Sequence, residues 1–536
     1  MLNYAQFSLT QMLSHFGVDI SLLNEQDYAL LEQSNAMVND TRKLSKNDIF
    51  CAIVGEQQDG REYIDQAIKL GAAIVLIECD TATQHGEITR ARVGSDIALA
   101  IKFYQLNYHL FALCQHYYQV PQKQITMIGV TGTNGKTSTC QIIAKLLEAN
   151  HQSCAVIGTL GVGKVDDLTP IANTTPGATE LHQYLNTFKE MSIENVAMEV
   201  SSHALSQRRI TNNIIDIAVF TNLTRDHLDY HHTMAAYSDA KKEIFNENSD
   251  QIAILNGDDQ QAQQWLTHWN NQHTCIVYGK KINVSQYPCF VMANNIHHTN
   301  QGTCFDLITH LGELKIQSPL LGDFNVDNLL AAISVLLAKK QPLNSIIQAV
   351  LKLTPVIGRM ESYSYSHKAM AVVDYAHTPD ALKNALIACR MHCKGDLWVV
   401  FGCGGDRDKG KRALMGEIAE QLADHITITN DNPRNETPEL IATDIIAGCV
   451  HPEKITIILD RKQAVLSTLA KAKTEDLVLL AGKGHENTII VGKNIIDYSE
   501  RTVVQQFYDD QVADKKTKNE TSNKLNQNKN NNEGIV

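Results

Sequence analysis

The sequence lacks any long apolar run: no segment of its 536 residues approaches the roughly 18 apolar residues that a membrane-spanning helix requires. Its first residues, from Met1 to Gln6, also lack the basic stretch and apolar core of an export signal. We therefore expect a cytoplasmic protein with no membrane partner.

The sequence also lacks an excess of positive charge, and it lacks closely spaced pairs of cysteines. The net charge of −12 argues against nucleic acid as the main partner, although local Arg and Lys clusters can still bind an anionic substrate. The twelve cysteines show no C-x-x-C spacing. They are expected to be reduced packing residues, not disulfides or zinc ligands.

What the chain does contain is enough material for several cores. A length of 536 residues predicts two to four domains, and 43% hydrophobic with 20% charged residues is typical of a globular protein. The end of the chain is rich in Asn and Lys and is expected to be disordered. We predict an α/β fold class with segments 1–118, 119–350, 351–512 and a tail 513–536.

Short apolar runs predict the strands of two sheets. In the middle segment they precede polar or glycine-containing turns, with helical patterns between them, which predicts a parallel doubly wound sheet whose chemistry lies at the carboxyl ends of its strands. These runs are 125–130, 196–200, 217–221 and 252–256. A second Rossmann-like sheet is predicted from 371–374, 397–401, 426–430, 455–459 and 477–480, after a linker near 355–360. The first segment shows a helix at 63–70 and a buried strand at 72–77.

The most informative motif is T-G-T-N-G-K-T at Thr131 to Thr137. It follows a strand candidate and precedes the amphipathic segment Cys140 to Leu147, the context of a phosphate-binding loop. Val130 stands where the strict pattern has its first glycine. A glycine-rich turn that binds nothing is the alternative.

Each residue type in this loop suits a nucleotide triphosphate. Backbone N–H groups freed by Gly132 and Gly135 can converge on phosphate oxygens, Lys136 can neutralise the β/γ charge, and the Thr137 hydroxyl can ligate Mg²⁺. Thr133 and Asn134 complete the loop.

Three further polar clusters are expected at or just beyond strand ends of the middle segment: Met198 to His203, Thr221 to Asp229, and Ala240 to Phe245. Glu199 and His227, together with Thr137, would suit Mg²⁺. A lone Glu or His at a strand end is more often a solvated residue, so the argument depends on the order of these motifs after the phosphate loop.

Taken together, the motifs resemble those of the Mur ligases of peptidoglycan precursor synthesis. They are T-G-T-N-G-K-T, E-V-S-S-H, T-N-L-T-R-D-H-L-D-Y-H, G-D-F-N-V-D-N, G-R-M-E, V-D-Y-A-H-T-P-D-A-L, G-C-G-G-D-R-D-K-G-K-R, D-N-P-R and G-K-G-H-E, spread over about residues 38–500. The resemblance implies three domains: an N-terminal UDP-sugar-binding domain, a central ATP-binding ligase domain, and a C-terminal domain that binds the incoming amino acid.

The resemblance also implies the chemistry. ATP, with Mg²⁺, would phosphorylate the D-Glu carboxylate of UDP-N-acetylmuramoyl-L-Ala-D-Glu to an acyl phosphate, which the amine of an amino acid attacks. By the same resemblance Lys241, and not its neighbour Lys242, is a carbamylated lysine that joins Thr137, Glu199 and His227 at the metal. We expect a monomer.

Further nucleotide contacts are implied in the same way. Arg359 would reach the γ-phosphate when the domains close, and Asp374 would contact the ribose. Asn256 and His377 would lie near adenine. An Asp that only caps the next helix is the alternative for Asp374.

The muramoyl dipeptide is expected to meet residues that match the family's substrate-contacting positions. Thr41 would contact the uracil side, and hydroxyls with an Arg suit the anionic remainder. These other residues are Asn173, Thr174, Thr175, Ser201, Gln207 and Arg209.

The motif Asp431-Asn432-Pro433-Arg434 bears on which amino acid is added. An Arg fork can bind the distal carboxylate of meso-diaminopimelate, which L-lysine lacks, so diaminopimelate is favoured. By resemblance Arg407, Gly482 and Glu486 complete the site with Asn432. A surface turn is the alternative for the motif alone.

Other functions remain open at this point. They are an L-lysine-adding ligase of the same family, a folylpolyglutamate synthase-like ligase, a P-loop kinase of a small molecule, and a catalytically silent nucleotide-binding scaffold. Phosphate release that needs both the nucleotide-sugar dipeptide and an amino acid would separate a ligase from a kinase.

Overall fold

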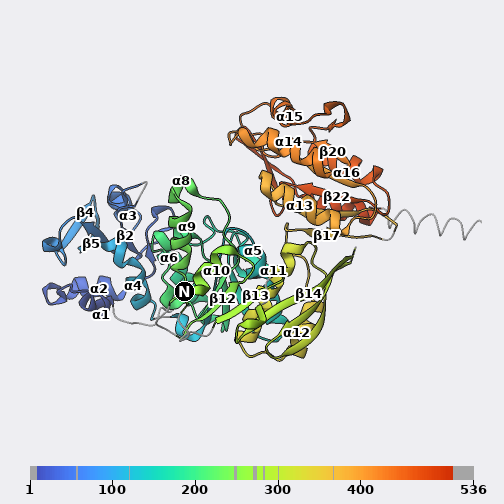
Figure 1. Ribbon diagram of the computed structural model, residues 1–536. Coiled ribbons are helices and arrows are strands. Elements are labelled where there is room, and N and C mark those ends of the chain that lie inside the picture. The colour runs from blue at the N-terminus through green and yellow to red at the C-terminus, as the bar shows by residue number, and fades with distance from the viewer. Residues whose placement is uncertain are drawn as a thin grey trace, which may run out of the picture. The chain divides into compact units, whose positions relative to one another are not determined.

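The computed structural model describes residues 9–55, 58–119, 121–246, 250–269, 275–281, 284–299, 301–365 and 367–510, and Figure 1 labels its elements. The predicted tail 513–536 lies outside these residues. The chain divides into two compact units, one of residues 1–291 with 331–342 and one of 292–330 with 343–536. Each is described by itself.

The first unit begins with a five-stranded sheet in the order β1-β2-β3-β5-β4. The predicted buried strand is confirmed as β3, and the helix before it as α3. The strands are β1 (Met37–Val38), β2 (Ile49–Ala52), β3 (Ile74–Cys79), β4 (Ile88–Val93) and β5 (Asp96–Tyr104), with helices α1 (Leu9–His15), α2 (Glu25–Glu32), α3 (Ile64–Lys69) and α4 (Leu106–Tyr117).

A larger sheet follows, in which the order within this unit is β13-β12-β11-β6-β10-β7-β8-β9. The pairs among β6, β7 and β10 to β13 are parallel, as predicted for β6, β10, β11 and β12, whereas β7 and β13 were not predicted. These strands are β6 (Thr126–Thr131), β7 (Cys154–Gly158), β10 (Asn195–Glu199), β11 (Ile217–Phe220), β12 (Ile252–Asn256) and β13 (Cys275–Gly279). Its helices are α5 (Lys136–Ala149), α6 (Ala178–Glu190), α7 (Ser202–Ser206), α8 (Leu228–His231), α9 (Met234–Lys242) and α10 (Gln260–Thr267).

The sequence patterns did not predict the antiparallel ribbon at one edge of this sheet. It consists of β8 (Gly161–Lys164) and β9 (Asp167–Thr169), and β8 also pairs antiparallel with β7. Both strands are short, and Gly161 and Gly163 interrupt the apolar alternation that would mark a strand.

The second unit contains a six-stranded sheet in the order β17-β18-β22-β19-β20-β21, parallel except at the β17 edge. Its strands are β17 (Glu361–Tyr363), β18 (Met370–Asp374), β19 (Leu397–Phe401), β20 (His425–Ile428), β21 (Thr456–Ile457) and β22 (Leu477–Ala481). The helices are α13 (Pro379–His392), α14 (Gly410–Leu422), α15 (Pro438–Ile446) and α16 (Arg461–Lys471), and a hairpin follows of β23 (Thr488–Val491) and β24 (Asn494–Asp497). Before this sheet in the chain come β14 (Phe290–Thr299), β15 (Gly302–Thr309), β16 (Gly312–Ser318), α11 (Asp323–Ala338) and α12 (Leu343–Leu351), and the division into units falls within β14 and α11.

Two strands of this sheet are shorter than predicted. β20 ends at Ile428 instead of reaching Asn430, because the Asn430 carbonyl turns to accept a hydrogen bond from Arg461 Nη1 at 2.9 Å. β21 keeps only two residues, both exposed, at the edge of the sheet.

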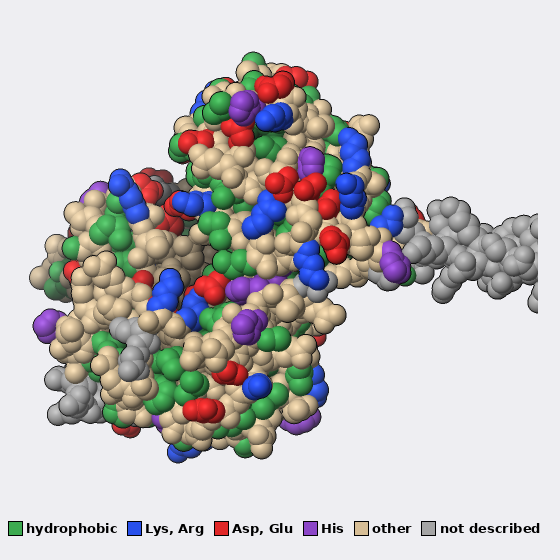
Figure 2. Space-filling view, turned by 45° about the vertical axis from the view of Figure 1, so that its right-hand side comes forward, with side chains coloured by type: hydrophobic (Ala, Val, Ile, Leu, Met, Phe, Trp, Pro, Cys, Tyr) green, Lys and Arg blue, Asp and Glu red, His purple; other side chains and the backbone are tan. Residues whose placement is uncertain are grey.

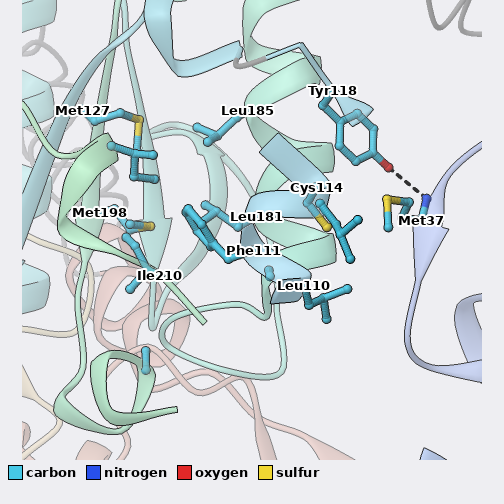
Figure 3. Packing of buried hydrophobic residues seen from close by; sticks show 14 of the residues in the cluster. Met37, Leu110, Phe111, Cys114, Tyr118, Met127, Leu181, Leu185, Met198 and Ile210 are labelled. Carbon is cyan, nitrogen blue, oxygen red and sulfur yellow. Dashed lines mark hydrogen bonds between the residues drawn. The ribbon is translucent and has the colours of Figure 1, made fainter. Parts of the chain in front are cut away.

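One apolar core joins the first sheet to the larger one within the first unit (Figure 3). Met37 of β1, Phe111 of α4, Leu181 of α6 and Met198 of β10 belong to it, and the Met37 N–H donates to the Tyr118 hydroxyl at 3.1 Å. The two sheets are therefore held as one body, so a cleft between them has fixed walls.

No helix among the described residues is both long and apolar enough to cross a membrane. All twelve cysteines lie within the described residues and are free thiols, seven of them buried, as predicted from their spacing. On the face that Figure 2 shows, basic side chains are interspersed with acidic and apolar ones.

Candidate functional site

The phosphate-loop motif connects β6 to α5 and needs its glycines. A Cβ on Gly132, which has a φ of +149°, would lie 1.9 Å from Thr221 Oγ1. Gly135 is the N-cap of α5 with a φ of +85°. Because only glycine fits at Gly132, and because Gly135 is left-handed, the loop can bring backbone N–H groups and the helix N-terminus to one point.

Two lysines meet at the carbonyl of Gly132. Lys136 Nζ donates to this oxygen at 2.8 Å, and Lys241 Nζ donates to it at 2.9 Å. Lys241 is 1% exposed, and its ammonium lies 4.5 Å from the Tyr237 ring centroid. Burial lowers the pKa of Lys241 well below its usual range, and the nearby Lys136 charge lowers this pKa further. The structure thus buries Lys241 beside the loop, where its charged form is disfavoured, whereas Lys242 is only half-buried.

A buried carboxylate faces the start of α5. Thr137 Oγ1 donates to Glu199 Oε2 at 2.9 Å, and the Thr159 N–H donates to Glu199 Oε1 at 2.7 Å. A Cβ on Gly158 would lie 2.2 Å from Glu199 Oε1, so the neighbouring strand makes room for this side chain. Hydroxyl and carboxylate oxygens are the donors that Mg²⁺ prefers.

His227 begins α8 with a left-handed φ of +52°. Its ring centroid lies 4.9 Å from that of His203, edge to face. Partial burial lowers the pKa of His227, and the charges of Lys136 and Lys241 add to this effect. This shift favours the neutral imidazole, which is the form that can ligate a metal, although the Asp226 carboxylate opposes it.

One expectation about this region was wrong. The cluster Ala240 to Phe245 does not follow a strand but lies at the end of helix α9, which Thr233 caps by accepting the Ala236 N–H. No group of three or more His, Cys, Asp and Glu side chains among the described residues is arranged to hold a metal ion. The predicted set differs from such a group because it depends on a threonine hydroxyl and a lysine.

Asn256 ends β12, and its side chain stabilises the neighbouring strand end. Asn256 Nδ2 donates to the Thr221 carbonyl at 2.8 Å. Thr221 Oγ1 in turn donates to the Asn134 carbonyl at 2.6 Å. These bonds connect Asn256 to the phosphate loop within one unit.

A cleft of about 630 Å³ opens in the first unit between its two sheets. Gln207 and Arg209, two of the predicted dipeptide contacts, line it. Sequence reasoning missed Arg208, which lies over the Tyr108 ring at 4.0 Å, because nothing in the local pattern signals a cation–π contact with a distant residue.

Other predicted dipeptide contacts form a small hydrogen-bonded group. The Ser201 N–H donates to Thr175 Oγ1 at 3.0 Å, and Arg209 Nη1 reaches the Thr175 carbonyl at 3.5 Å. Thr174 Oγ1 lies 3.1 Å from Thr159 Oγ1. Two more predicted residues stand apart from this bonding: Asn173 is exposed, and Thr41 is buried in the 3-10 turn Thr41–Lys43.

Asp374 ends β18 in the second unit and does not cap the next helix, which Thr378 caps. It accepts the N–H groups of Met360 and Ala376, both at 2.8 Å. Local burial raises the pKa of Asp374, and the Arg359 charge opposes that rise. Asp374 thus holds the segment that carries Arg359.

Arg359 and His377 flank Tyr375. The Arg359 guanidinium lies 4.9 Å from the Tyr375 ring centroid. Its Nε is buried and has no hydrogen-bond partner among the described residues, so a donor remains for an anion. The His377 side chain is exposed, and its Nδ1 lies 2.9 Å from the Tyr375 carbonyl.

The predicted acceptor residues come together at the carboxyl ends of β20 and β22. Asn432 Nδ2 donates to Glu486 Oε2 at 3.0 Å, and Arg434 Nη1 donates to the Gly405 carbonyl at 2.9 Å. Gly482 has a φ of +110°. Asp431 and Pro433 are buried, whereas Arg407 is exposed.

Three buried cations beneath these residues were missed. Arg412 bonds Glu436 and Asp444, and this guanidinium lowers the pKa of Glu436 to about 2. A single basic residue in its local pattern gives no sign of burial, and each of the three contacts a carboxylate far along the chain, as Lys483 contacts Asp431. The other two are Arg461, paired with Glu500, and Lys483.

Comparison with known protein families matches three regions of the chain. They are the Mur ligase family catalytic domain at residues 35–105, the Mur ligase middle domain at 130–336, and the Mur ligase glutamate ligase domain at 358–484.

Individual relatives match most of the chain. UDP-N-acetylmuramoyl-L-alanyl-D-glutamate–2,6-diaminopimelate ligase of Haemophilus influenzae (strain KW20 / Rd) is 42% identical over 471 residues, which cover 88% of this chain and 95% of that protein. A solved structure of a ligase of that name is similar with a TM-score of 0.65 and 32% identity, covering 89% and 95% of the two chains. Folylpolyglutamate synthase of Mycobacterium tuberculosis, solved with ADP and AMPPCP, has 17% identity and a TM-score of 0.54 over 69% of this chain and 91% of its own, so it shares the fold.

Proposed function

Because this chain belongs to the Mur ligase family, we propose that it adds meso-2,6-diaminopimelate to UDP-N-acetylmuramoyl-L-alanyl-D-glutamate at the expense of ATP, in peptidoglycan precursor biosynthesis. The reaction class is amide-bond formation by an ATP-dependent ligase. The observation that carries the proposal is the site around Gly132, where two lysines meet one carbonyl beside the Thr137–Glu199 contact.

Activation of the dipeptide is the step that needs ATP. A carboxylate is a poor electrophile, and its conversion to an acyl phosphate removes the negative charge and supplies a leaving group. The incoming amine then attacks, and the tetrahedral intermediate releases phosphate and leaves the amide. The loop around Gly132 would hold the phosphates, and Lys136 would neutralise charge on the transferred phosphoryl group.

The residues present fit a magnesium ion. Thr137, Glu199 and His227 would hold it, and bound Mg²⁺ would stabilise negative charge on the phosphoryl oxygens. Lys241 would join them after its uncharged amine adds to CO₂: an N–C bond forms, a proton leaves to solvent, and an anionic oxygen results. Burial supports this assignment because it disfavours the ammonium form, which would repel the metal.

The cleft of the first unit would bind the nucleotide-sugar dipeptide. Gln207 and Arg209 line it with Arg208, and the two guanidinium groups would suit the diphosphate and carboxylate groups of the ligand. Thr175 and Ser201 are bonded to each other, Arg209 bonds the Thr175 carbonyl, and this group would position the dipeptide end. Thr41, Asn173 and Thr174 remain proposed contacts.

The second unit would supply the amino acid and further nucleotide contacts. Arg434 would bind the distal carboxylate of diaminopimelate and Glu486 its ammonium, with Asn432 and Arg407 beside them. Arg359 would use its unpartnered donor on the γ-phosphate, and Asp374 would contact the ribose. We propose that the enzyme is cytoplasmic and acts as a monomer.

The test is a reconstitution with mass measurement of the product. Purified protein is incubated with the UDP-muramoyl dipeptide, Mg-ATP and either meso-diaminopimelate or L-lysine, and each reactant is also omitted in turn. We expect a product that carries diaminopimelate and phosphate release that needs all reactants. A stable phosphorylated product from one substrate would indicate a kinase, and preference for L-lysine would replace the proposed acceptor.

A further inference from the structure

Lys483 lies fully buried beneath the proposed acceptor site, where it hydrogen-bonds two of its residues and forms an ion pair with a third. Its ammonium donates to Asn432 Oδ1 and to Glu486 Oε2, both at 2.9 Å, and lies 3.2 Å from Asp431 Oδ1. A fourth contact, to the Thr488 carbonyl at 2.7 Å, joins the ammonium to the start of β23. Burial of an ammonium group has a large unfavourable desolvation free energy, which these contacts must offset.

Two left-handed glycines direct this side chain inward. Gly482 has a φ of +110° and Gly484 a φ of +49°. A Cβ on Gly484 would lie 2.6 Å from Tyr375 Cβ, so the backbone there passes against the neighbouring strand end and leaves no room for another residue. The backbone on either side of Lys483 therefore needs glycine, because both positions are left-handed and neighbouring backbone approaches Gly484 closely.

The ammonium also separates two carboxylates. Asp431 and Glu486 both contact Lys483, and without a cation between them their negative charges would repel each other. Lys483 and Asn432 together hold Glu486 Oε2, whereas no group among the described residues bonds Glu486 Oε1. The Glu486 side chain is 30% exposed. One oxygen of this partly exposed carboxylate is thus anchored by Lys483 and Asn432, and the other has no hydrogen-bond partner among the described residues.

We propose that Lys483 is a positioning residue for the amino-acid acceptor. It sets the orientation of Glu486 and Asn432 so that Glu486 Oε1 can accept a hydrogen bond from the acceptor ammonium. Lys483 itself is covered by these side chains and touches no reacting atom. The inference rests on the proposed function, because it assumes that an amino acid binds at Glu486.

The experiment compares Lys483→Met with a matched control, Lys493→Met. Lys493 is an exposed lysine in the turn between β23 and β24, so the same substitution there removes a charge without touching the pocket. In Lys483→Met we expect the KM for meso-diaminopimelate to rise roughly 10- to 100-fold, as loss of charged hydrogen bonds implies. The KM values for ATP and the UDP-muramoyl dipeptide, and kcat at saturating acceptor, should stay near the parent values.

An unchanged acceptor KM in Lys483→Met would overturn the inference, as would an equal rise of all three KM values, which indicates general loss of structure. If thermal melting shows that Lys483→Met is unfolded, Lys483→Gln replaces it, since Gln keeps N–H donors without the charge. The same comparison of KM values then decides.

A double-mutant cycle separates positioning from a remote packing role. If Lys483 acts through Glu486, then Lys483→Met should add little to the acceptor KM of Glu486→Gln, whereas independent roles would give multiplied effects. Parent protein that forms no product with all reactants would refute the proposed function. Parent activity with multiplied effects in the double variant would refute only the role of Lys483.

Discussion

Arg434 offers the sharpest test of how the acceptor is chosen. Its backbone is held to the β23–β24 hairpin, because its N–H donates to the Ile490 carbonyl at 3.0 Å. Its Nη1 donates to the Gly405 carbonyl at 2.9 Å. No group among the described residues bonds its Nε or Nη2, so two donors remain for a carboxylate.

The expected cost of Arg434→Ala follows from these two donors. If each charge-assisted hydrogen bond contributes about 1.5 kcal/mol net, the loss is about 3 kcal/mol, or on the order of 100-fold in kcat/KM for meso-diaminopimelate. The KM for ATP should not change, because Arg434 lies among the acceptor residues and the phosphate loop is in the other unit. Thermal stability should also be kept, since Ala inherits the same left-handed backbone, with a φ of +51°.

The assay is phosphate release at limiting acceptor, with Arg434→Lys and L-lysine as comparisons. Lys keeps the charge but not the planar fork, so Arg434→Lys should recover only part of the loss. L-lysine has no distal carboxylate, and its use should be equally poor in parent and variant. Equal kcat/KM of parent and Arg434→Ala for meso-diaminopimelate would refute the assignment.

Three further outcomes are expected. Lys241→Ala should be nearly inactive, and added short carboxylates should restore part of its activity. The control Lys242→Ala should keep its activity. Full activity of Lys241→Ala would rule out a catalytic role for Lys241. Gly132→Ala should weaken nucleotide binding by about 2 kcal/mol, roughly 30-fold, because the added Cβ would lie 1.9 Å from Thr221 Oγ1. An unchanged nucleotide affinity in a binding titration would contradict this expectation. Burial in α6 lowers the pKa of His182 from 6.5 to about 4. Below pH 6.5 the unfolded chain therefore binds a proton at this residue that the folded chain does not bind. The free energy of unfolding should consequently fall by about 3 kcal/mol between pH 6.5 and 4. Unfolding measured across this range should show a smaller loss in His182→Leu, and identical pH dependence would count against the assignment.

The phosphate loop and the parallel strands could be predicted because their signals are local. The loop needs glycines at Gly132 and Gly135, and the four predicted strands of the larger sheet, β6, β10, β11 and β12, are short apolar runs before a turn. The resemblance to the Mur ligases added residues such as Lys241, which the structure buries at 1% exposure. The antiparallel ribbon at Gly161 escaped notice because its strands are short and interrupted by glycine.

The sequence by itself determined the order of the elements, the loop that can hold phosphate, and the set of motifs that places the chain in its family. Only the tertiary structure decided which cations are buried: Lys483, Arg412 and Arg461 look like surface residues in their local patterns. Each becomes stable in the interior because carboxylates from distant segments meet it, as Glu500 meets Arg461 at 2.8 Å. Such pairing depends on where the chain returns in space, and no pattern of neighbouring residues encodes that.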